Sequence, residues 1–387
     1  MKQFILILLL LTALESQGQY VWKQNADIPT KGCFQSAFVI GDVAYAGLGC
    51  ISFNGYKTTD KFYKYDPVGD TWTPVASFPG GGRYGAAAFA LKGKGYICFG
   101  RDDAQNWNNE IWEYDPAADT WTRKKDFPGG ARYESTGFAI NDTGYIAGGS
   151  FNAGTNYLKD AWRYFPVSDV WSQLPDLPVE HKSAAAGLSL NGKGYVLGGL
   201  NDTYTASNDN LVYDPELNHW TQLPSFPGAP LRDPAAFTLE GKIFLGAGMN
   251  PDPSGSEVFS SFRAFDPALS TWSSCPGLPS PASPRYGATG FTVADAGYVS
   301  DAAEICASDA TVRTLTLKAT NATVYLPPSV APVYNYQWLD TTGTPIPGAN
   351  NSTYTVASAF ANNISSNFSV IMTSTTPSPL GCGATTS

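Results

Sequence analysis

Tryptophan recurs with a period of about fifty residues over the first three quarters of the chain. The spacings are 50, 49, 50, 49 and 52 residues between Trp22, Trp72, Trp121, Trp171, Trp220 and Trp272. Each tryptophan stands in a similar phrase, such as DTWTPVASFP or NHWTQLPSFP, and YDP or a variant of it precedes most of them. An apolar run ending in glycine, such as GYIAGG or GYVLGG, is the second mark of each period. Units of this kind bury their surfaces by stacking on one another, so we expect a repeat architecture.

Each period contains four short runs of strand-like composition with turn residues between them. In the second period these runs are GAAAFAL, KGYICFG, IWEYD and TWTRK. The chain has 39 Gly and 28 Pro among 387 residues, which excludes a helical bundle. Aromatic residues make up 13% and charged residues 15%, a composition that argues against disorder. We therefore predict an all-β protein made of four-stranded units.

These marks resemble the kelch repeat, with a double glycine ending strand two, a tyrosine before the strand 3–4 turn and a tryptophan on strand four. Gly148-Gly149 and Gly198-Gly199 match fully, and the resemblance covers residues 20–305. It implies a six-bladed β-propeller with five complete blades, at roughly 31–77, 82–126, 131–175, 181–225 and 231–276. The last blade begins at Arg285 and lacks its own tryptophan, so we expect Val21–Gln24 to close the ring as its fourth strand. Its third strand is not evident from the sequence.

The two ends of the chain differ from the repeats. Residues 1–18 have the form of a secretory signal peptide, with Lys2 before an apolar stretch too short to span a membrane. No cysteine follows for a lipoprotein anchor, so we expect a secreted or cell-surface protein with a propeller over residues 19–305. Residues 306–387 resemble Ig-like modules of secreted bacterial proteins, especially those of Bacteroidota, with Trp338 as the core tryptophan. We leave open whether this module is truncated.

Cysteine, histidine and charge limit the chemistry further. Six cysteines allow full pairing in an exported protein, at positions 33, 50, 98, 275, 306 and 382. Their connectivity does not follow from sequence, although Cys306 and Cys382 bracket the last segment and are the best single pair. Neither CxxC nor Cys/His spacing occurs, so we predict no metal site and no cofactor. The net charge of −9 argues against a nucleic-acid partner.

One basic residue recurs where the chain leads into the first strand of each blade. These residues are Lys31, Arg83, Arg132, Lys182, Arg232 and Arg285. Strand one lines the central channel of a propeller, so their side chains could form a ring that attracts anions, carboxylates above all. Kelch substrate adaptors resemble this arrangement and bind acidic peptides. The alternative is structural: the same side chains could bridge neighbouring blades through acidic groups or carbonyls.

The connections between strands two and three lie on the same face and carry aromatic side chains beside amides and carboxylates. The candidates for ligand contact are Trp107, Tyr157 and Tyr204. Aromatic faces and hydrogen-bonding groups suit sugar rings. Any one of these aromatics could instead be a packing plug, but as a set they make this face the default binding site.

The sequence gives less support to a catalytic function. Copper radical oxidases have a similar fold, but His219 on strand four is predicted at the outer rim and could not meet His181. The sialidase box S-x-D-x-G-x-x-W is absent. A sialate mutarotase or lyase-like kelch enzyme stays open, with Glu134, Glu180 and Asp233 as candidate general bases.

We predict a monomeric, secreted, non-catalytic recognition protein that binds a carbohydrate or an acidic protein segment on the propeller face. A sialic or uronic acid enzyme and a structural or adhesive surface component are the alternatives. We assign no catalytic residue, and we expect no membrane insertion.

Overall fold

The structure is a computed structural model, and it describes most of the residues between 20 and 299 and three later strands. The described residues are 20–52, 56–151, 156–179, 182–201, 205–251, 257–278, 286–293, 296–299, 314–319, 334–339 and 369–374. The chain divides into two compact units, Met1–Asn321 and Ala322–Ser387. Every regular element in the described part is a β-strand. None of the described residues forms a helix long and apolar enough to cross a membrane.

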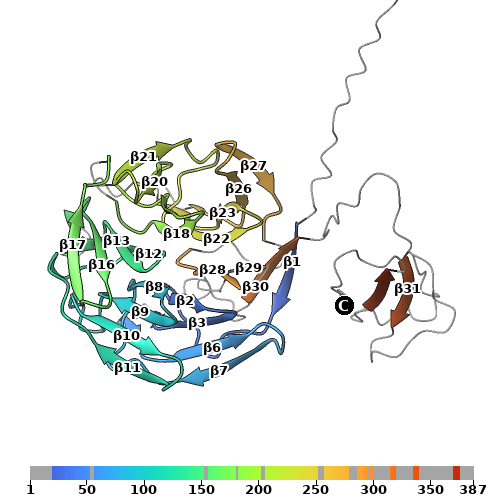
Figure 1. Ribbon diagram of the computed structural model, residues 1–387, viewed down its shortest axis with the longest axis horizontal. Helices are drawn as coiled ribbons and strands as arrows, with labels where there is room; N and C mark the ends of the chain where they lie inside the picture. Colours follow the sequence, from blue (N-terminus) through green and yellow to red (C-terminus); the bar gives the residue numbers. More distant parts are fainter. Residues whose placement is uncertain are drawn as a thin grey trace, which may run out of the picture. The chain divides into compact units, whose positions relative to one another are not determined.

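Six four-stranded antiparallel sheets surround the central axis of the first unit, and we number them as blades 1–6 in chain order (Figure 1). Blade 1 contains β2 (Ser36–Ile40), β3 (Val43–Gly47), β6 (Phe62–Asp66) and β7 (Thr71–Val75). Blade 2 contains β8 (Ala87–Leu91), β9 (Lys94–Cys98), β10 (Ile111–Asp115) and β11 (Thr120–Arg123). Blade 3 contains β12 (Thr136–Ile140), β13 (Thr143–Ala147), β16 (Ala161–Phe165) and β17 (Val170–Leu174).

The remaining blades follow the same order of strands. Blade 4 contains β18 (Ala186–Leu190), β19 (Lys193–Leu197), β20 (Asn210–Asp214) and β21 (His219–Leu223). Blade 5 contains β22 (Ala235–Leu239), β23 (Lys242–Gly246), β26 (Phe262–Asp266) and β27 (Thr271–Cys275). Blade 6 contains β28 (Gly290–Val293), β29 (Ala296–Val299), β30 (Thr314–Ala319) and β1 (Tyr20–Asn25). The predicted all-β propeller is confirmed.

Blade 6 is built from both ends of the propeller segment. β1 pairs with β30 from Tyr20 opposite Ala319 to Asn25 opposite Thr314, and β30 pairs in turn with β29. The N-terminal strand thus occupies the fourth position, where the sequence analysis expected Val21–Gln24. The third strand, β30, comes from the segment that the sequence analysis gave to the Ig-like module. The first unit accordingly extends to Asn321, beyond the boundary expected after residue 305.

The YDP-to-tryptophan phrase joins each blade to the one before it. In blade 1 the Tyr65 hydroxyl donates to Asp70 at 2.7 Å, and the same carboxylate oxygen accepts the backbone N–H of Ala26 at 2.8 Å. The Trp72 indole N–H donates to the carbonyl of Ala26 at 3.0 Å. Trp22 closes the ring with the same bond, to the carbonyl of Pro276 at 2.9 Å. Trp121, Trp220 and Trp272 make the equivalent bond to the preceding blade, whereas the indole N–H of Trp171 in blade 3 is buried without a hydrogen-bond partner. The fifty-residue period therefore reflects a contact between blades that recurs in five of the six.

Glycine in the second strand allows close approach between blades. A Cβ atom placed on Gly95 would lie 2.1 Å from the ring of Phe38 in the preceding blade. Gly144 has the same relation to Phe89, and Gly194 to Phe138. Each phenylalanine lies flat against the strand-two tyrosine of its own blade, as Phe38 does on Tyr45 at 5.3 Å. Gly95, Gly144 and Gly194 are thus required because the phenylalanine of the preceding blade occupies the space that a side chain would take.

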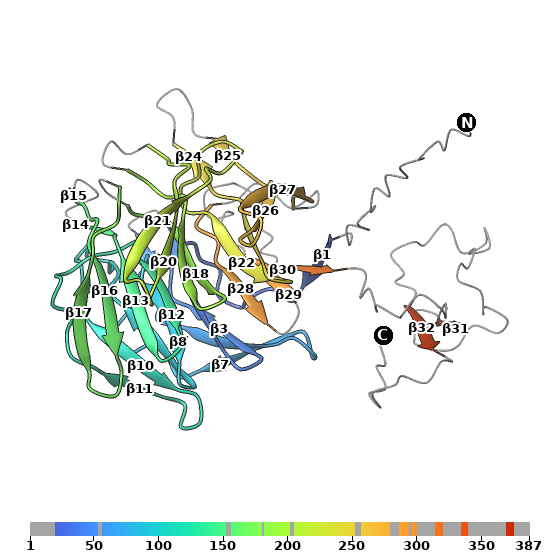
Figure 2. The ribbon, with the colours of Figure 1, turned by 45° about the horizontal axis from the view of Figure 1, so that its top comes forward.

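Three of the connections between strands two and three contain a short hairpin, and Figure 2 labels those of blades 3 and 5. They are β4 (Cys50–Ser52) with β5 (Lys57–Thr58), β14 (Ser150–Phe151) with β15 (Asn156–Tyr157), and β24 (Met249–Asn250) with β25 (Glu257–Val258). In the second unit, β31 (Tyr334–Leu339) pairs with β32 (Ser369–Ser374), and Trp338 lies on β31. Cys306 and Cys382 lie outside the described residues.

Candidate functional site

A closed ring of backbone hydrogen bonds surrounds the propeller axis. It consists of one residue from each blade: Phe34, Gly85, Glu134, Ala184, Asp233 and Gly287. Each N–H donates to the carbonyl of the preceding member, and Phe34 closes the circle by donating to Gly287 at 2.9 Å. All six have left-handed backbone conformations, with φ between 49° and 64°. We call this set the axial ring.

The axial ring frames a cavity of about 130 Å³. Each ring member lines it together with the following residue of its blade, from Phe34 and Gln35 round to Gly287 and Ala288. Most of these side chains are small, which leaves room at the centre. The cavity lies on the side of the connections leading into strand one, because its lining residues stand just before that strand in each blade. This is the face that the sequence analysis chose as the default site.

Two of the ring members are acidic, and Arg232 lies between them. Its Nε donates to Asp233 Oδ2 at 2.7 Å, and its Nη2 lies 3.4 Å from Glu134 Oε1. The Ser183 hydroxyl donates to Glu134 Oε2 at 3.3 Å. Burial raises the pKa of Glu134 to about 7 despite the opposing effect of Arg232, and burial also raises the pKa of Asp233. The cavity thus carries a carboxyl group that can exchange a proton near neutral pH.

Aromatic rings gather beside the cavity in blades 1, 2 and 3. Tyr84 contacts Phe34, Tyr56 and Tyr133, with ring centroids 6.1, 6.3 and 6.0 Å away respectively. Phe34 lines the cavity and Tyr56 is 43% exposed, so this aromatic group reaches from the cavity to solvent.

Arg101 adds a cation to the aromatic group. Its guanidinium lies 4.9 Å from the ring centre of Trp107 and 5.6 Å from that of Tyr133. Its Nη1 donates to the Tyr84 hydroxyl at 3.3 Å. Within the described part of the chain Arg101 forms no salt bridge, so its charge is balanced by no direct carboxylate contact there.

Arg83 and Arg132, two members of the predicted basic ring, are buried and bind groups of the protein itself. Each is 1% exposed. Arg83 donates to the carbonyls of Phe99 and Gly80 and pairs with Glu110 at 2.9 Å. Arg132 donates to the carbonyl of Gly148 and forms two bonds to Asp160, at 2.8 and 3.0 Å.

The remaining basic positions differ from one another in their surroundings. Lys182 is 1% exposed, donates to Ser207 Oγ and the Asp209 carbonyl, and has its pKa lowered by burial to about 8. Lys31 is exposed, and Arg285 lies outside the described residues. Arg232 contacts Glu134 and Asp233, which line the cavity. At Arg83, Arg132 and Lys182 the structure supports the structural interpretation, because no hydrogen-bonding face of these side chains is open to a ligand.

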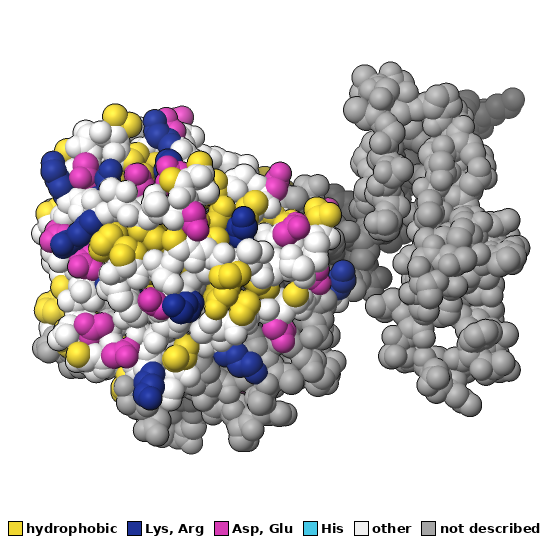
Figure 3. Space-filling view, turned by 90° about the horizontal axis from the view of Figure 1, so that it is seen from below, with side chains coloured by type: hydrophobic (Ala, Val, Ile, Leu, Met, Phe, Trp, Pro, Cys, Tyr) yellow, Lys and Arg dark blue, Asp and Glu magenta, His cyan; other side chains and the backbone are white. Residues whose placement is uncertain are grey.

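Side chains on one side of the molecule show no continuous basic surface in the described part (Figure 3). Lys and Arg are interspersed there with Asp, Glu and hydrophobic residues. Exposed pairs such as Lys92 with Asp142, at 3.0 Å, fit this mixture.

The three aromatic residues predicted to contact a ligand lie in different places. Trp107 is half-buried under Arg101 beside the cavity. Tyr157 is 7% exposed and packs with Ala184 and Leu200, so it supports the ring from outside. Tyr204 lies outside the described residues, as do Glu180 and His181.

Sequence reasoning missed Arg101 and the tyrosines Tyr84 and Tyr133. The sequence signal for the two tyrosines is the phrase Arg-Tyr, at 83–84 and 132–133. The arginine turns into the blade, and the tyrosine after it joins the group beside the cavity. Arg101 follows directly on Gly100, which lies two residues beyond the end of β9 in blade 2.

Among the described residues, no group of three or more His, Cys, Asp or Glu side chains is placed to hold a metal ion.

A family model of the Attractin/LZTR1 beta-propeller matches residues 47–300. The chain belongs to this family. No match was found among curated proteins. The solved structure of YjhT is similar to this member of the Attractin/LZTR1 beta-propeller family, with a TM-score of 0.66 and 15% sequence identity over 77% of this chain and 98% of that chain. At this identity the likeness shows the fold alone.

Proposed function

We propose that the propeller recognises a carbohydrate at the axial cavity and the aromatic group beside it. The observation that carries this proposal is the junction of the two: Phe34 belongs both to the cavity wall and to the aromatic group. A cavity of about 130 Å³ has room for one sugar residue or less, so the rest of the ligand would lie along the open face.

The chemistry around the cavity fits hydroxyl-bearing rings. Glu134 and Asp233 offer carboxylate oxygens, which accept hydrogen bonds from hydroxyl groups. The exposed ring of Tyr56 offers an apolar face against which a sugar ring can pack. Two acidic groups beside the cavity disfavour an acidic protein segment there, which the sequence analysis had kept as an equal alternative.

A glycan array tests the proposal directly. We expect the purified chain to bind a restricted set of glycans, and Tyr56→Ala to weaken that binding at least tenfold. Val68→Ala is the control, since Val68 is 94% exposed on a strand 3–4 turn of the same blade. Comparison at low and high salt reports whether the charge of Arg101 contributes, because salt screens exposed charges. Absence of binding at both salt concentrations would overturn the proposal.

Carbohydrate turnover is a second candidate, favoured by one observation. Glu134 lines the cavity, and its pKa is raised to about 7, which suits a general acid or base at neutral pH. Glu134→Gln would then abolish turnover of a bound glycan while leaving its binding within a few-fold. If array-selected glycans are recovered unchanged after prolonged incubation with the protein, this candidate is set aside.

We also propose that the protein is exported, with residues 1–18 removed as a signal peptide, and that residues after the propeller form an Ig-like spacer. The support is the apolar stretch after Lys2 and the strand-forming sequence around Trp338. N-terminal sequencing of the protein from its native source should begin near Gln19. A sequence that begins at Met1 would contradict export by this route.

A further inference from the structure

Cys33 and Cys50 face each other in blade 1 beside the axial ring. They form an isolated antiparallel bridge and exchange both backbone hydrogen bonds, Cys33 N to Cys50 O at 3.0 Å and Cys50 N to Cys33 O at 2.8 Å. In such a pair the Cα atoms are about 5.5 Å apart. A disulfide spans Cα separations of about 4.4–6.8 Å. The Cα separation typical of such a pair thus falls within the range for a disulfide, and both cysteines are free thiols in this structure.

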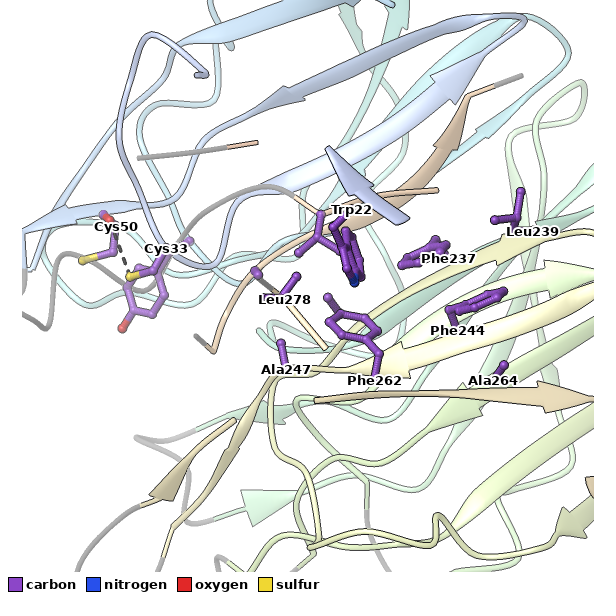
Figure 4. Close-up of a cluster of buried hydrophobic side chains, with 14 of the residues drawn as sticks. Trp22, Cys33, Cys50, Phe237, Leu239, Phe244, Ala247, Phe262, Ala264 and Leu278 are labelled. Carbon is purple, nitrogen blue, oxygen red and sulfur yellow. Dashed lines mark hydrogen bonds between the residues drawn. The ribbon is translucent and has the colours of Figure 1, made fainter. Parts of the chain in front are cut away.

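Figure 4 shows the two cysteines next to each other, joined by a hydrogen bond. Cys33 is 1% exposed and Cys50 is fully buried. Cys33 Sγ donates to the carbonyl oxygen of Cys50 at 3.6 Å. Cys50 Sγ donates to the carbonyl oxygen of Ser52 at 3.2 Å. A hydrogen bond from the Cys33 thiol lowers the pKa of the Cys50 thiol.

The other described cysteines have no such relation. Cys98 lies on β9 in blade 2 and Cys275 on β27 in blade 5, and these blades are not adjacent. In blades 2 to 5 the positions equivalent to Cys33 and Cys50 are bridged by backbone hydrogen bonds as well. Those pairs are Tyr84 with Arg101, Tyr133 with Ser150, Ser183 with Leu200, and Arg232 with Met249. Only the blade 1 pair among these has two side chains that can be joined covalently.

We propose that Cys33 and Cys50 form a disulfide that fixes the wall of the axial cavity in blade 1. The oxidant is a small-molecule disulfide such as glutathione disulfide, and the reaction takes place while blade 1 folds. One cysteine thiolate attacks the glutathione disulfide and releases one glutathione thiolate. The second cysteine thiolate attacks the resulting mixed disulfide and releases the other. The two cysteines lose two protons and two electrons, and the glutathione disulfide becomes two glutathione thiols.

The consequence concerns the cavity wall. Phe34 and Gln35 follow Cys33 directly and both line the cavity. A bond from Cys33 to Cys50 would tie this segment to β4, the first strand of the hairpin that leads to Tyr56. The link would thereby hold together the cavity wall and the exposed aromatic residue beside it.

Peptide mapping tests the disulfide without any variant. The full chain is refolded in a glutathione redox buffer, its free thiols are alkylated, and it is digested without reduction. Trypsin leaves both cysteines in one peptide, residues 32–57, and cleavage before Asp42 separates them unless a disulfide joins them. We expect the joined pair, lighter by two hydrogens and carrying no alkyl group. Two alkylated cysteines, or either one bonded elsewhere, would overturn the proposal.

Thermal unfolding gives a second readout with a matched control. A disulfide that closes a short loop should raise the Tm of this propeller by roughly 5 °C. Reductant should therefore lower the Tm of the native chain by more than it lowers the Tm of Cys33→Ser/Cys50→Ser, which lacks this bond. Any effect of reductant on the other cysteines is the same in both proteins and cancels in the comparison. An equal response of both proteins to reductant would contradict the proposal even if the double variant is less stable.

Discussion

At the scale of single residues, the same basic position serves different purposes around the ring. Arg83 and Arg132 turn away from the axis, and each lies over a phenylalanine, as Arg132 does at 4.7 Å from the ring centre of Phe127. Arg232 instead pairs with two carboxylates at the cavity. The Phe-Pro-Gly-Gly phrases before Arg83 and Arg132 mark the form that turns away from the axis. Alignment of charges alone could not separate the two cases, because all three side chains are buried and their partners depend on these neighbours.

Arg132→Ala should destabilise the propeller by about 3–5 kcal/mol, the usual consequence of removing one partner of a buried ion pair. The loss leaves Asp160 and the carbonyl of Gly148 without their donor. Chemical denaturation measures the effect. Arg123→Ala is the matched control, because Arg123 is 49% exposed beside Asp126 and its removal should cost less than about 1 kcal/mol. Equal, small losses for both variants would contradict the buried role of Arg132.

Glu134 should make stability depend on pH in the acidic to neutral range. Its pKa is about 7 in the folded protein because of burial, against an ordinary value of 4.5. Between these values the folded chain holds a proton that the unfolded chain releases, so the free energy of unfolding falls as pH rises. Asp233, whose pKa is also raised, acts in the same direction.

Glu134→Gln should flatten this slope between about pH 4.5 and pH 7. Denaturation midpoints measured across that range test it, with exposed Glu216→Gln as the control. A slope unchanged by Glu134→Gln would show that the carboxyl group is not buried as described.

At the scale of elements, the repeat could be predicted because the residues that recur are those that make the contacts between blades. The tryptophan, the tyrosine before the turn and the glycine of strand two each act on a neighbouring blade or turn, so they recur at fixed spacing. β30 could not be predicted in the same way. It pairs with β29 and β1 through its backbone and lacks the YDP phrase, because the chain does not turn there into its own strand four.

Trp22→Ala should destabilise the propeller by about 3–5 kcal/mol. Trp22 is 9% exposed and packs against Phe262 and Phe237, with ring centroids 5.2 and 6.0 Å away (Figure 4). Trp220→Ala is the matched reference, because Trp220 makes the same bond between blades 3 and 4, to the carbonyl of Pro175, away from the point of ring closure. If Trp22→Ala changes stability by less than about 1 kcal/mol while Trp220→Ala unfolds the protein, β1 does not close the ring.

At the scale of the whole molecule, ring closure creates the site. The axial ring exists only when all six blades are present, because each member accepts a hydrogen bond from one neighbour and donates to the other. The sequence was sufficient for the propeller and for the face that holds the cavity. It was insufficient for the residues of the cavity, since these are far apart in the chain and meet only at the axis. Glu134 and Asp233 had been noted only as candidate bases near a basic ring.

The central claim is that ligand binding takes place at the axis, and a cavity-filling substitution tests it most directly. Ala184 lines the cavity in the same left-handed conformation in which blade 1 carries Phe34, so phenylalanine is compatible with the backbone there. Calorimetric titration with a glycan from the array should show at least tenfold weaker binding to Ala184→Phe. Binding to Ala117→Phe, on an exposed strand 3–4 turn of blade 2, should be unchanged. Full affinity of a folded Ala184→Phe variant would contradict the axial site.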